Sequence, residues 1–301
     1  MTVPQTREIG NPRRSAVSPG RLARGVRALY PPGMLHVANG DHALSVLRAA
    51  GLQGEVIAWS DVLDQGPVRG EPGTAAFREL RAEWLATNGA GELEQVSAQL
   101  ERWDAALRTP AGETVLWFEA DLTCQLALLH HLVLIEASAV VTREPVPEQK
   151  DFAALLDTRK RYDRAQARRA WEAVAAPDPR GLQALDVAGL PPQMGPALRR
   201  LIEELPEVGS GLSRTERTVL EEEGSFPRVQ AREPVPWITD LFFARVVTEL
   251  HEAGMFDEPA RSECLGGKLD YRTRATDRWV GGVLLSGSSC FRRDGSRIVP
   301  P

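Results

Sequence analysis

The stretch MLHVANGDHALSVLRAAG, residues 34–51, indicates the type of fold. Its first part, 34–38, is a short apolar run that predicts a buried strand, and Asn39-Gly40-Asp41 predicts a tight turn. Over 42–50 the apolar residues recur every three or four positions, which predicts a helix, and Gly51 is a typical helix end. A strand followed closely by a helix is the repeating unit of α/β proteins.

The alternation of strands and helices continues beyond this stretch. Three further apolar runs have the length of strands, at 55–59, 114–118 and 139–141. Apolar residues at helical spacing occupy the stretches between them, over 77–85, 93–107 and 122–135. We therefore expect an α/β fold with a Rossmann-like, mainly parallel sheet over 31–145, covered by helices on both faces.

The rest of the chain divides into three parts. Residues 1–30 are rich in Arg, Pro, Gly and Ser and predict a flexible basic arm. Residues 146–206 predict a helical connector that includes one long helix over 151–176. Ser213-Arg214-Thr215-Glu216 fits a capping box at the start of a further helix. Helices followed by short apolar runs with paired glycines predict a winged-helix-like module over 207–301.

Charge and cysteine content exclude several classes of protein. The 301 residues carry 36 Lys and Arg against 41 Asp and Glu, a net charge of −5, so there is no overall positive field for nucleic acid or an anionic membrane. No apolar run approaches the ~20 residues that span a bilayer. Three widely spaced cysteines, at 124, 264 and 290, do not suit a secreted disulfide framework. We expect a cytoplasmic protein with no membrane segment; its oligomeric state stays open.

Polar residues gather at the carboxyl ends of three predicted strands. Ligands of open parallel sheets bind at that edge, because loops and helix N-termini converge there. The candidate catalytic residues are acidic: Asp41, Asp61, Glu119 and Asp121. The candidate ligand-binding residues are His36, Asn39, Gly40, Trp59 and Gln125.

A shared pocket would bring the four carboxylates close together. Carboxylates ~4 Å apart repel by roughly 4 kcal/mol at an effective dielectric near 20. A divalent cation, a cationic ligand or protonation of one carboxyl group would relieve that repulsion. Mg²⁺ is therefore one cofactor that the cluster could hold, and the identity of any metal stays open.

Each candidate also has a structural interpretation. Asp41 and Asp121 stand where a carboxylate can cap a helix N-terminus. His36 lies inside a strand and could be a hydrogen-bonded core histidine. Trp59 could roof the pocket instead of stacking on a ring. Three further residues are expected to be structural: Cys124, His130 and His131.

Several of these segments carry a resemblance to a known bacterial family. The N-terminal segments are LHVANGD at 35–41, GEVIAWSDVL at 54–63 with GPV at 66–68, and LWFEADL at 116–122 with Gln125. They are similar to the domain-of-unknown-function family numbered 1835. GLSRTER at 211–217 and DRWVGGV at 277–283 resemble the C-terminal part of its full-length members. The resemblance covers most of the chain after the arm, and it implies no settled biochemical role.

The chain departs from that family at three places. Gln65 stands where members often have an acidic residue, which would remove one carboxylate from the pocket. Leu284 stands where members have a His, and FRRD at 291–294 replaces a Trp-rich strand. The last two departures argue against a polar role for the C-terminal hairpin.

Two classes of function fit these residues. Acids, amides and an imidazole at one sheet edge favour a protein that binds or transforms a polar small molecule, of hydrolase or transferase type. The alternative is a transcription regulator or interaction protein that acts through the C-terminal module. Its expected recognition helix spans 237–253. That helix is a poor reader of DNA because acidic residues outnumber basic ones: Asp240, Glu249 and Glu252 against Arg245. The module could instead pack on the α/β domain or mediate dimerisation.

Overall fold

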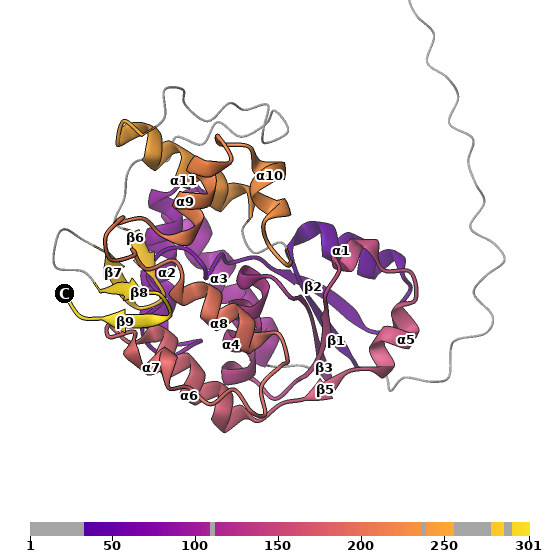
Figure 1. Ribbon diagram of the computed structural model, residues 1–301. Coiled ribbons are helices and arrows are strands. Elements are labelled where there is room, and N and C mark those ends of the chain that lie inside the picture. The colour runs from indigo at the N-terminus through magenta and orange to yellow at the C-terminus, as the bar shows by residue number, and fades with distance from the viewer. Residues whose placement is uncertain (1–32, 109–111, 236–238, 256–277, 286–290) are drawn as a thin grey trace, which may run out of the picture. The chain divides into compact units, whose positions relative to one another are not determined.

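A five-stranded sheet with the strand order β2-β1-β3-β4-β5 organises the fold (Figure 1). The strands are β1 (Leu35–Asn39), β2 (Glu55–Trp59), β3 (Thr114–Glu119), β4 (Ser138–Thr142) and β5 (Lys160–Arg161). The first four are parallel, and β5 pairs antiparallel with β4. This confirms the mainly parallel α/β sheet that the sequence predicts.

The computed structural model describes residues 33–108, 112–235, 239–255, 278–285 and 291–301. The predicted arm at 1–30 lies outside these residues, as do Cys264 and Cys290. Residues 32–301 form one compact unit. Within the described residues, no helix is both long enough and apolar enough to cross a membrane.

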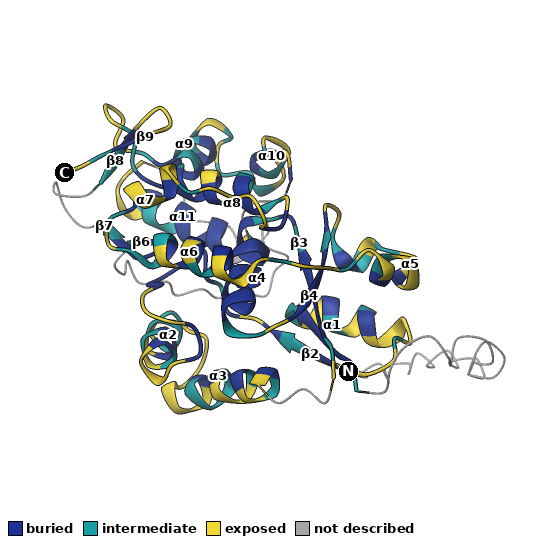
Figure 2. Ribbon diagram, turned by 90° about the horizontal axis from the view of Figure 1, so that it is seen from below, coloured by how far each residue is buried: buried dark blue, intermediate teal, exposed yellow. Residues whose placement is uncertain are grey.

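Helices cover both faces of the sheet. The helices up to the end of the sheet are α1 (Gly40–Ala49), α2 (Ala75–Thr87), α3 (Leu93–Arg108), α4 (Leu122–Leu134), the short 3₁₀ helix η1 (Val146–Glu148) and α5 (Phe152–Asp157). Those that follow are α6 (Arg164–Ala175), α7 (Arg180–Gln183), α8 (Met194–Ile202), α9 (Arg214–Glu221), α10 (Phe226–Ala231) and α11 (Asp240–Glu252). Helices α1 and α5 lie on one face of the sheet and α4 lies on the other (Figures 1 and 2).

The two faces of the sheet receive alternate side chains of each strand, as strand geometry requires. Val37 and Phe118 belong to the large apolar core that continues into α4, α6 and α8. Trp117 points to the other face, where its ring contacts Phe152 of α5 at a centroid distance of 6.0 Å. Because four parallel strands are buried on both faces, their sequences are continuous apolar runs.

The junction of β1 and α1 differs from the prediction. The helix begins at Gly40, directly after the strand, so the tight turn predicted at 39–41 is absent. Gly40 has a φ of +82°, a conformation that other residues adopt only with strain.

The long helix predicted over 151–176 is also wrong. The chain forms α5, then the short edge strand β5, then α6. The side chain of Asp163 accepts hydrogen bonds from the backbone of Ala165 and Gln166 and thereby starts α6 as a new helix. One basic residue of this stretch, Arg159, pairs with Glu113 at 3.0 Å.

The C-terminal residues do not support the predicted winged-helix module. Helices α9, α10 and α11 share an apolar core that includes Val219, Val229 and Phe243. The short strands that the structure describes here form two separate antiparallel pairs, β6 (Arg278–Val280) with β7 (Val283–Leu285) and β8 (Arg292–Asp294) with β9 (Arg297–Val299). The capping box at the start of α9 is confirmed, with Ser213 and Glu216 bonded reciprocally.

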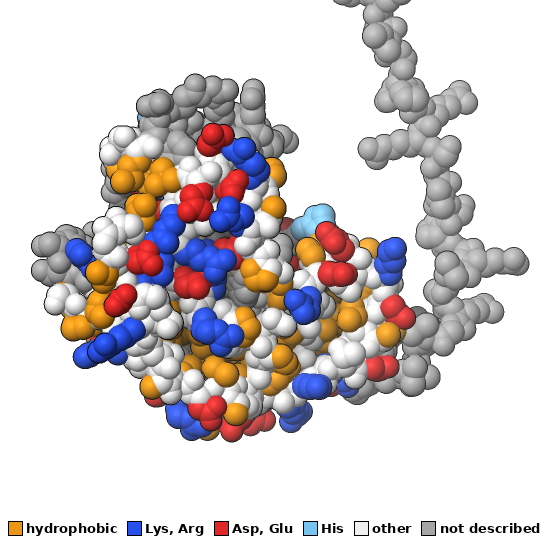
Figure 3. Space-filling model, viewed as in Figure 1, with side chains coloured by type: hydrophobic (Ala, Val, Ile, Leu, Met, Phe, Trp, Pro, Cys, Tyr) orange, Lys and Arg blue, Asp and Glu red, His pale blue; other side chains and the backbone are white. Residues whose placement is uncertain are grey.

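Ion pairs connect α8 with the segment after α10, and α9 with β6. Arg200 binds Glu204 and lies 3.0 Å from Glu233, and Arg278 binds Glu216. Although burial opposes the shift, Arg200 and Arg278 hold the pKa of Glu204 below its usual value. Acidic and basic side chains intermix over α8, α9 and α10 (Figure 3).

The turn between β6 and β7 contacts the α/β part of the chain. The amide of Gly282 donates to the carbonyl of Val174 at 2.7 Å, and the amide of Val68 donates to the carbonyl of Gly281 at 3.0 Å. Arg69 donates to the carbonyl of Gly282 at 2.8 Å. This turn therefore binds both the end of α6 and the loop that follows β2.

Gly282 leaves no room for a side chain. A Cβ atom there would lie 2.1 Å from the carbonyl oxygen of Ala175. We expect Gly282→Ala to lower the free energy of unfolding by about 1–3 kcal/mol, the usual cost of overpacking, as measured by urea denaturation. The matched control is Gly181→Ala, since a Cβ at Gly181 meets only an ordinary contact at 3.7 Å. Equal stability of the two variants would contradict the tight docking.

Candidate functional site

The candidate site lies at the carboxyl ends of β1 and β3. Strand β2 pairs with one edge of β1, and β3 pairs with the opposite edge of β1. The carboxyl edge between β1 and β3 is therefore a topological switch point, which is where open α/β sheets bind ligands. Asn39 ends β1 and Glu119 ends β3 at this edge.

Three side chains converge here. Glu119, Asp121 and Cys124 each offer one potential ligand atom, and these atoms all lie within 4.8 Å of one another. The side chain of Cys124 is buried and forms no disulfide. The sequence predicts Glu119 and Asp121 at this edge, whereas it favours a purely structural role for Cys124.

A separate hydrogen bond holds each of the three side chains. The Oδ1 atom of Asp121 accepts from the amide of Cys124 at 2.8 Å and so caps α4. The Oε1 atom of Glu119 accepts from the amide of Val146 in η1 at 2.8 Å. The side chain of Asn39 donates to the Sγ atom of Cys124 at 3.2 Å. Backbone and side chains from β1, α4 and η1 therefore fix the geometry of the cluster.

A third acidic residue, Asp64, lies close enough to Asp121 to feel its charge. It is 5% exposed, and neither of its carboxylate oxygens has a hydrogen-bond partner among the described residues. Burial, with a further contribution from the negative charge of Asp121, raises the pKa of Asp64 to about 7, although the nearby Thr123 and Arg81 oppose the shift. Such a buried, unpaired carboxyl group is costly for the fold.

The carboxyl groups of the cluster share this electrostatic environment. Burial, together with the charges of Asp121 and Glu148, raises the pKa of Glu119 to about 7. Burial also raises the pKa of Asp121, although the amide of Cys124 opposes it. Burial and the two neighbouring carboxylates raise the pKa of the Cys124 thiol well above its usual value. The cluster therefore lacks positive charge.

Asp61 does not belong to this cluster, which corrects the prediction. Its carboxylate binds the guanidinium of Arg81 in a bidentate way, with distances of 2.9 and 2.5 Å. Both side chains are buried. The charge of Asp61 is therefore neutralised by a residue of α2, and Asp61 is a structural residue.

Asp41 is likewise not part of the group formed by Glu119, Asp121 and Cys124. It is exposed on the first turn of α1, where its backbone carbonyl accepts from the hydroxyl of Ser45. The expectation that four carboxylates meet is thus correct for Glu119 and Asp121 and wrong for Asp41 and Asp61.

His36 is fully buried, which agrees with the structural interpretation of this residue. Its Nε2 atom lies 3.0 Å from the carbonyl of Gln53, and its Nδ1 atom accepts from the indole of Trp117 at 3.0 Å. Burial lowers its pKa, so the neutral ring uses both nitrogens within the protein. His36 also lies three residues before the carboxyl end of β1.

Trp59 is also part of the core. Its ring is 2% exposed and contacts the rings of Trp103, His130 and His131 at 6.0, 5.1 and 4.7 Å. This position agrees with packing in the core and not with a ring that stacks on a ligand. The two histidines pack in the core, as the sequence predicts.

The remaining predicted ligand-binding residues lie at the candidate site. Asn39 contacts Cys124, and Gly40 begins α1 at the end of β1. Gln125 is fully buried, and its Nε2 atom donates to the carbonyl of Glu119 at 2.6 Å. Its Oε1 atom has no hydrogen-bond partner among the described residues.

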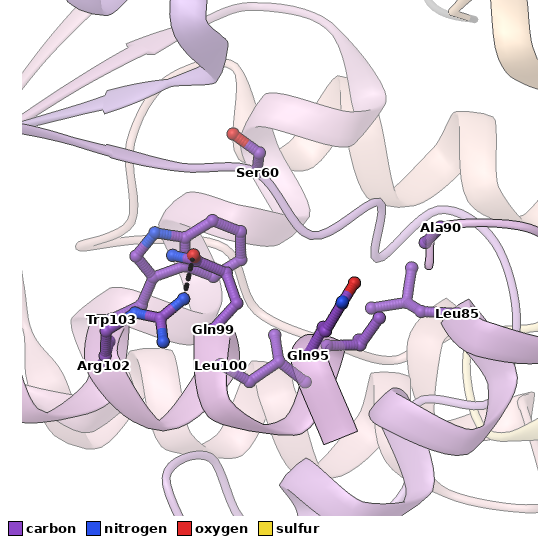
Figure 4. Close-up of a pocket in the computed structure, with 9 residues that line it drawn as sticks. Ser60, Leu85, Ala90, Gln95, Gln99, Leu100, Arg102 and Trp103 are labelled. Carbon is purple, nitrogen blue, oxygen red and sulfur yellow. Dashed lines mark hydrogen bonds between the residues drawn. The ribbon is translucent and has the colours of Figure 1, made fainter. Parts of the chain in front are cut away.

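A separate hollow of about 390 Å³ lies beside the carboxyl end of β2 (Figure 4). Ser60 borders it from the loop after β2, and Gln95, Gln99 and Arg102 border it from α3. Arg102 donates to the side chain of Gln99 at 2.6 Å. None of the predicted site residues lines this hollow.

Comparisons with protein-family models, with curated proteins and with solved structures find no match to this chain. The resemblance to the family numbered 1835 stays a prediction that depends on the sequence segments given above.

Proposed function

We propose that the chain binds and transforms a polar small molecule at the switch point between β1 and β3. The observation that supports this proposal is the environment of Asp64. It is a buried carboxyl group whose two oxygens have no hydrogen-bond partner among the described residues, and the charge of Asp121 acts on it. Natural proteins keep such costly groups mainly at sites of function. A ligand that fills the site would supply the missing hydrogen bonds or positive charge.

The composition of the site favours a hydrolase or a transferase. Carboxyl groups are common general acids and bases, and buried ones act on substrates from which water is excluded. Asn39 and Gln125 provide amide groups that can orient a polar substrate. Glu119, Asp121 and Asp64 would act as the acid–base groups, and the substrate carries hydroxyl, amine or phosphate groups.

Thermal unfolding in the presence of ligands tests the proposal. A panel of amines, sugars and phosphate esters is added to the wild type, and we expect at least one class to raise its Tm, because a ligand that binds the folded state stabilises it. Asp64→Asn should lose this ligand-induced shift, measured against its own baseline. The matched control is Glu55→Gln, because Glu55 is an exposed carboxylate at the opposite end of β2. An equal shift in both variants would contradict the proposed site.

The DNA-binding alternative lacks structural support in the described residues. Arg245, the basic residue of α11, is 5% exposed and pairs with Glu249 at 2.8 Å. Arg232 of the region after α10 pairs with Glu222 at 2.7 Å. Basic groups that are already paired with carboxylates are poor contacts for phosphate. Packing of the C-terminal hairpin on the α/β part is the interpretation that its hydrogen bonds favour.

A further inference from the structure

We propose that Glu119, Asp121 and Cys124 bind a transition-metal ion of the Zn²⁺ type and leave at least one coordination position open to a ligand. The inference deepens the proposed function at the same site: Glu119 and Asp121 become metal ligands, and Asp64 is left as the acid–base group. It rests on the proposed function only for its location. It differs from the sequence expectation, in which Mg²⁺ is the candidate and Cys124 is not a ligand.

The spacing of the three donor atoms suits one ion. Zinc binds sulfur at about 2.3 Å and carboxylate oxygen at about 2.0–2.2 Å, so ligands of one tetrahedral ion lie about 3.5 Å apart. The donor atoms of Glu119, Asp121 and Cys124 already lie within 4.8 Å of one another. Small side-chain rotations would complete the coordination.

The hydrogen bonds of the site suit metal ligands. Good metal sites orient each ligand by an outer hydrogen bond that leaves a donor atom free. The amide of Val146 donates to one oxygen of Glu119, and the amide of Cys124 donates to one oxygen of Asp121. A metal would take the other oxygen of each carboxylate. Asn39 donates to the sulfur of Cys124, which stabilises a thiolate.

Two buried polar groups independently indicate a missing ligand. The Oε1 atom of Gln125 is unpartnered among the described residues, and the other end of its amide binds the backbone of Glu119. Both oxygens of Asp64 have no hydrogen-bond partner among the described residues, and the charge of Asp121 acts on this carboxyl group. A bound cation with its water or substrate would supply donors to these oxygens and positive charge to the carboxylates.

The sulfur atom selects the type of metal. Mg²⁺ prefers oxygen ligands in an octahedral arrangement, whereas thiolate ligands favour softer ions such as Zn²⁺. Three protein ligands with an open position are typical of catalytic zinc sites, and four are typical of structural ones. When the metal binds, the thiol of Cys124 gives up its proton to the solvent and the sulfur forms the metal bond.

Cobalt provides the spectroscopic test, because Co²⁺ replaces Zn²⁺ and absorbs light. The full-length protein with Cys264→Ser and Cys290→Ser, freed of metal by a chelator, is titrated with Co²⁺ alone. We expect a stoichiometric sulfur-to-cobalt charge-transfer band in the near ultraviolet. Adding Cys124→Ser should abolish this band, and Asn39→Ala should weaken Co²⁺ affinity about 10–100-fold. Circular dichroism checks that each variant is folded.

Two outcomes would overturn the metal site. One is Co²⁺ binding without the charge-transfer band in the protein that retains Cys124. The other is stabilisation by Mg²⁺ with none by Zn²⁺ or Co²⁺. Asp121→Asn can fail to fold because Asp121 caps α4, so Glu119→Gln is the second ligand variant, expected to weaken Co²⁺ binding at least tenfold. Unchanged affinity in Glu119→Gln would also contradict the proposal.

The experiments can disprove the metal site and the proposed function independently of each other. If Co²⁺ binds through Cys124 but no molecule of the panel shifts the Tm with or without metal, the proposed function fails and the metal site stands. If a panel molecule stabilises the chelator-treated protein and Co²⁺ does not bind, the metal site fails and the proposed function stands.

Discussion

Arg81→Met is expected to lower the free energy of unfolding by about 3–5 kcal/mol, the usual cost of removing one partner of a buried ion pair. Arg81 is fully buried, and its two bonds to Asp61 would be lost. The methionine fills much of the volume but leaves the carboxylate of Asp61 buried without a counter-charge. Urea denaturation measures the loss.

The same guanidinium also holds the loop after β2 in place. It donates to the backbone carbonyls of Val62, Gln65 and Pro67. We therefore expect Arg81→Met to reduce the ligand-induced Tm shift as well, because the loop carries Asp64. In the double variant Asp61→Leu/Arg81→Met the uncompensated charge is gone, so part of the lost stability should return. A single-variant loss below about 1 kcal/mol, the range of exposed ion pairs, would contradict a structural role for this pair.

The sheet can be predicted from the sequence because burial on both faces makes each parallel strand a continuous apolar run. The strand predicted at 55–59 coincides with β2, and the one predicted at 114–118 differs from β3 by a single residue. The edge strand β5 cannot be predicted in this way, because it consists of two basic residues, Lys160 and Arg161. Only pairing with β4 makes these two residues a strand, and that pairing is tertiary.

The site is less predictable because its charges depend on partners far away in the sequence. Asp61 and Asp64 look alike in the sequence, yet Asp61 forms an ion pair with Arg81 and Asp64 forms none among the described residues. The sequence does contain one local indication of the partner of Asp61. Arg81 lies at helical spacing from Phe77 and Trp84, on the apolar stripe of the helix, and an arginine at such a position indicates a buried acidic partner.

Cys124 shows why Glu119 and Asp121 alone do not define the site. Its sulfur joins the carboxylates because Asp121 caps α4 through the amide of Cys124, which places both residues on the first turn. The separation of three residues between Asp121 and Cys124 can be seen in the sequence. The contact of the Cys124 sulfur with Asn39 cannot be predicted in this way, because Asn39 ends a strand far away in the sequence.

Asp64→Asn is expected to stabilise the metal-free protein at pH 8 by up to about 4 kcal/mol. The pKa of Asp64 rises from its ordinary value of 3.8 to about 7 on folding, and each pKa unit corresponds to about 1.4 kcal/mol. Below pH 4 the carboxyl group is protonated in both states, and it affects stability little. Between pH 4 and pH 7 the unfolded chain loses the proton before the folded protein does, so the wild type loses stability as the pH rises.

Asparagine has no such ionisation, so the advantage of Asp64→Asn over the wild type should grow from pH 4 to pH 7 and then stay constant. Chelator-treated protein is unfolded with urea at several pH values, with Glu55→Gln as the control that should follow the wild type. A loss of stability in Asp64→Asn at pH 8 would mean that the carboxylate has a favourable partner within the fold. A gain, together with loss of the ligand-induced Tm shift, would mean that the protein tolerates an unpaired buried charge because a ligand needs it, which is the trade-off between stability and activity expected of a functional site.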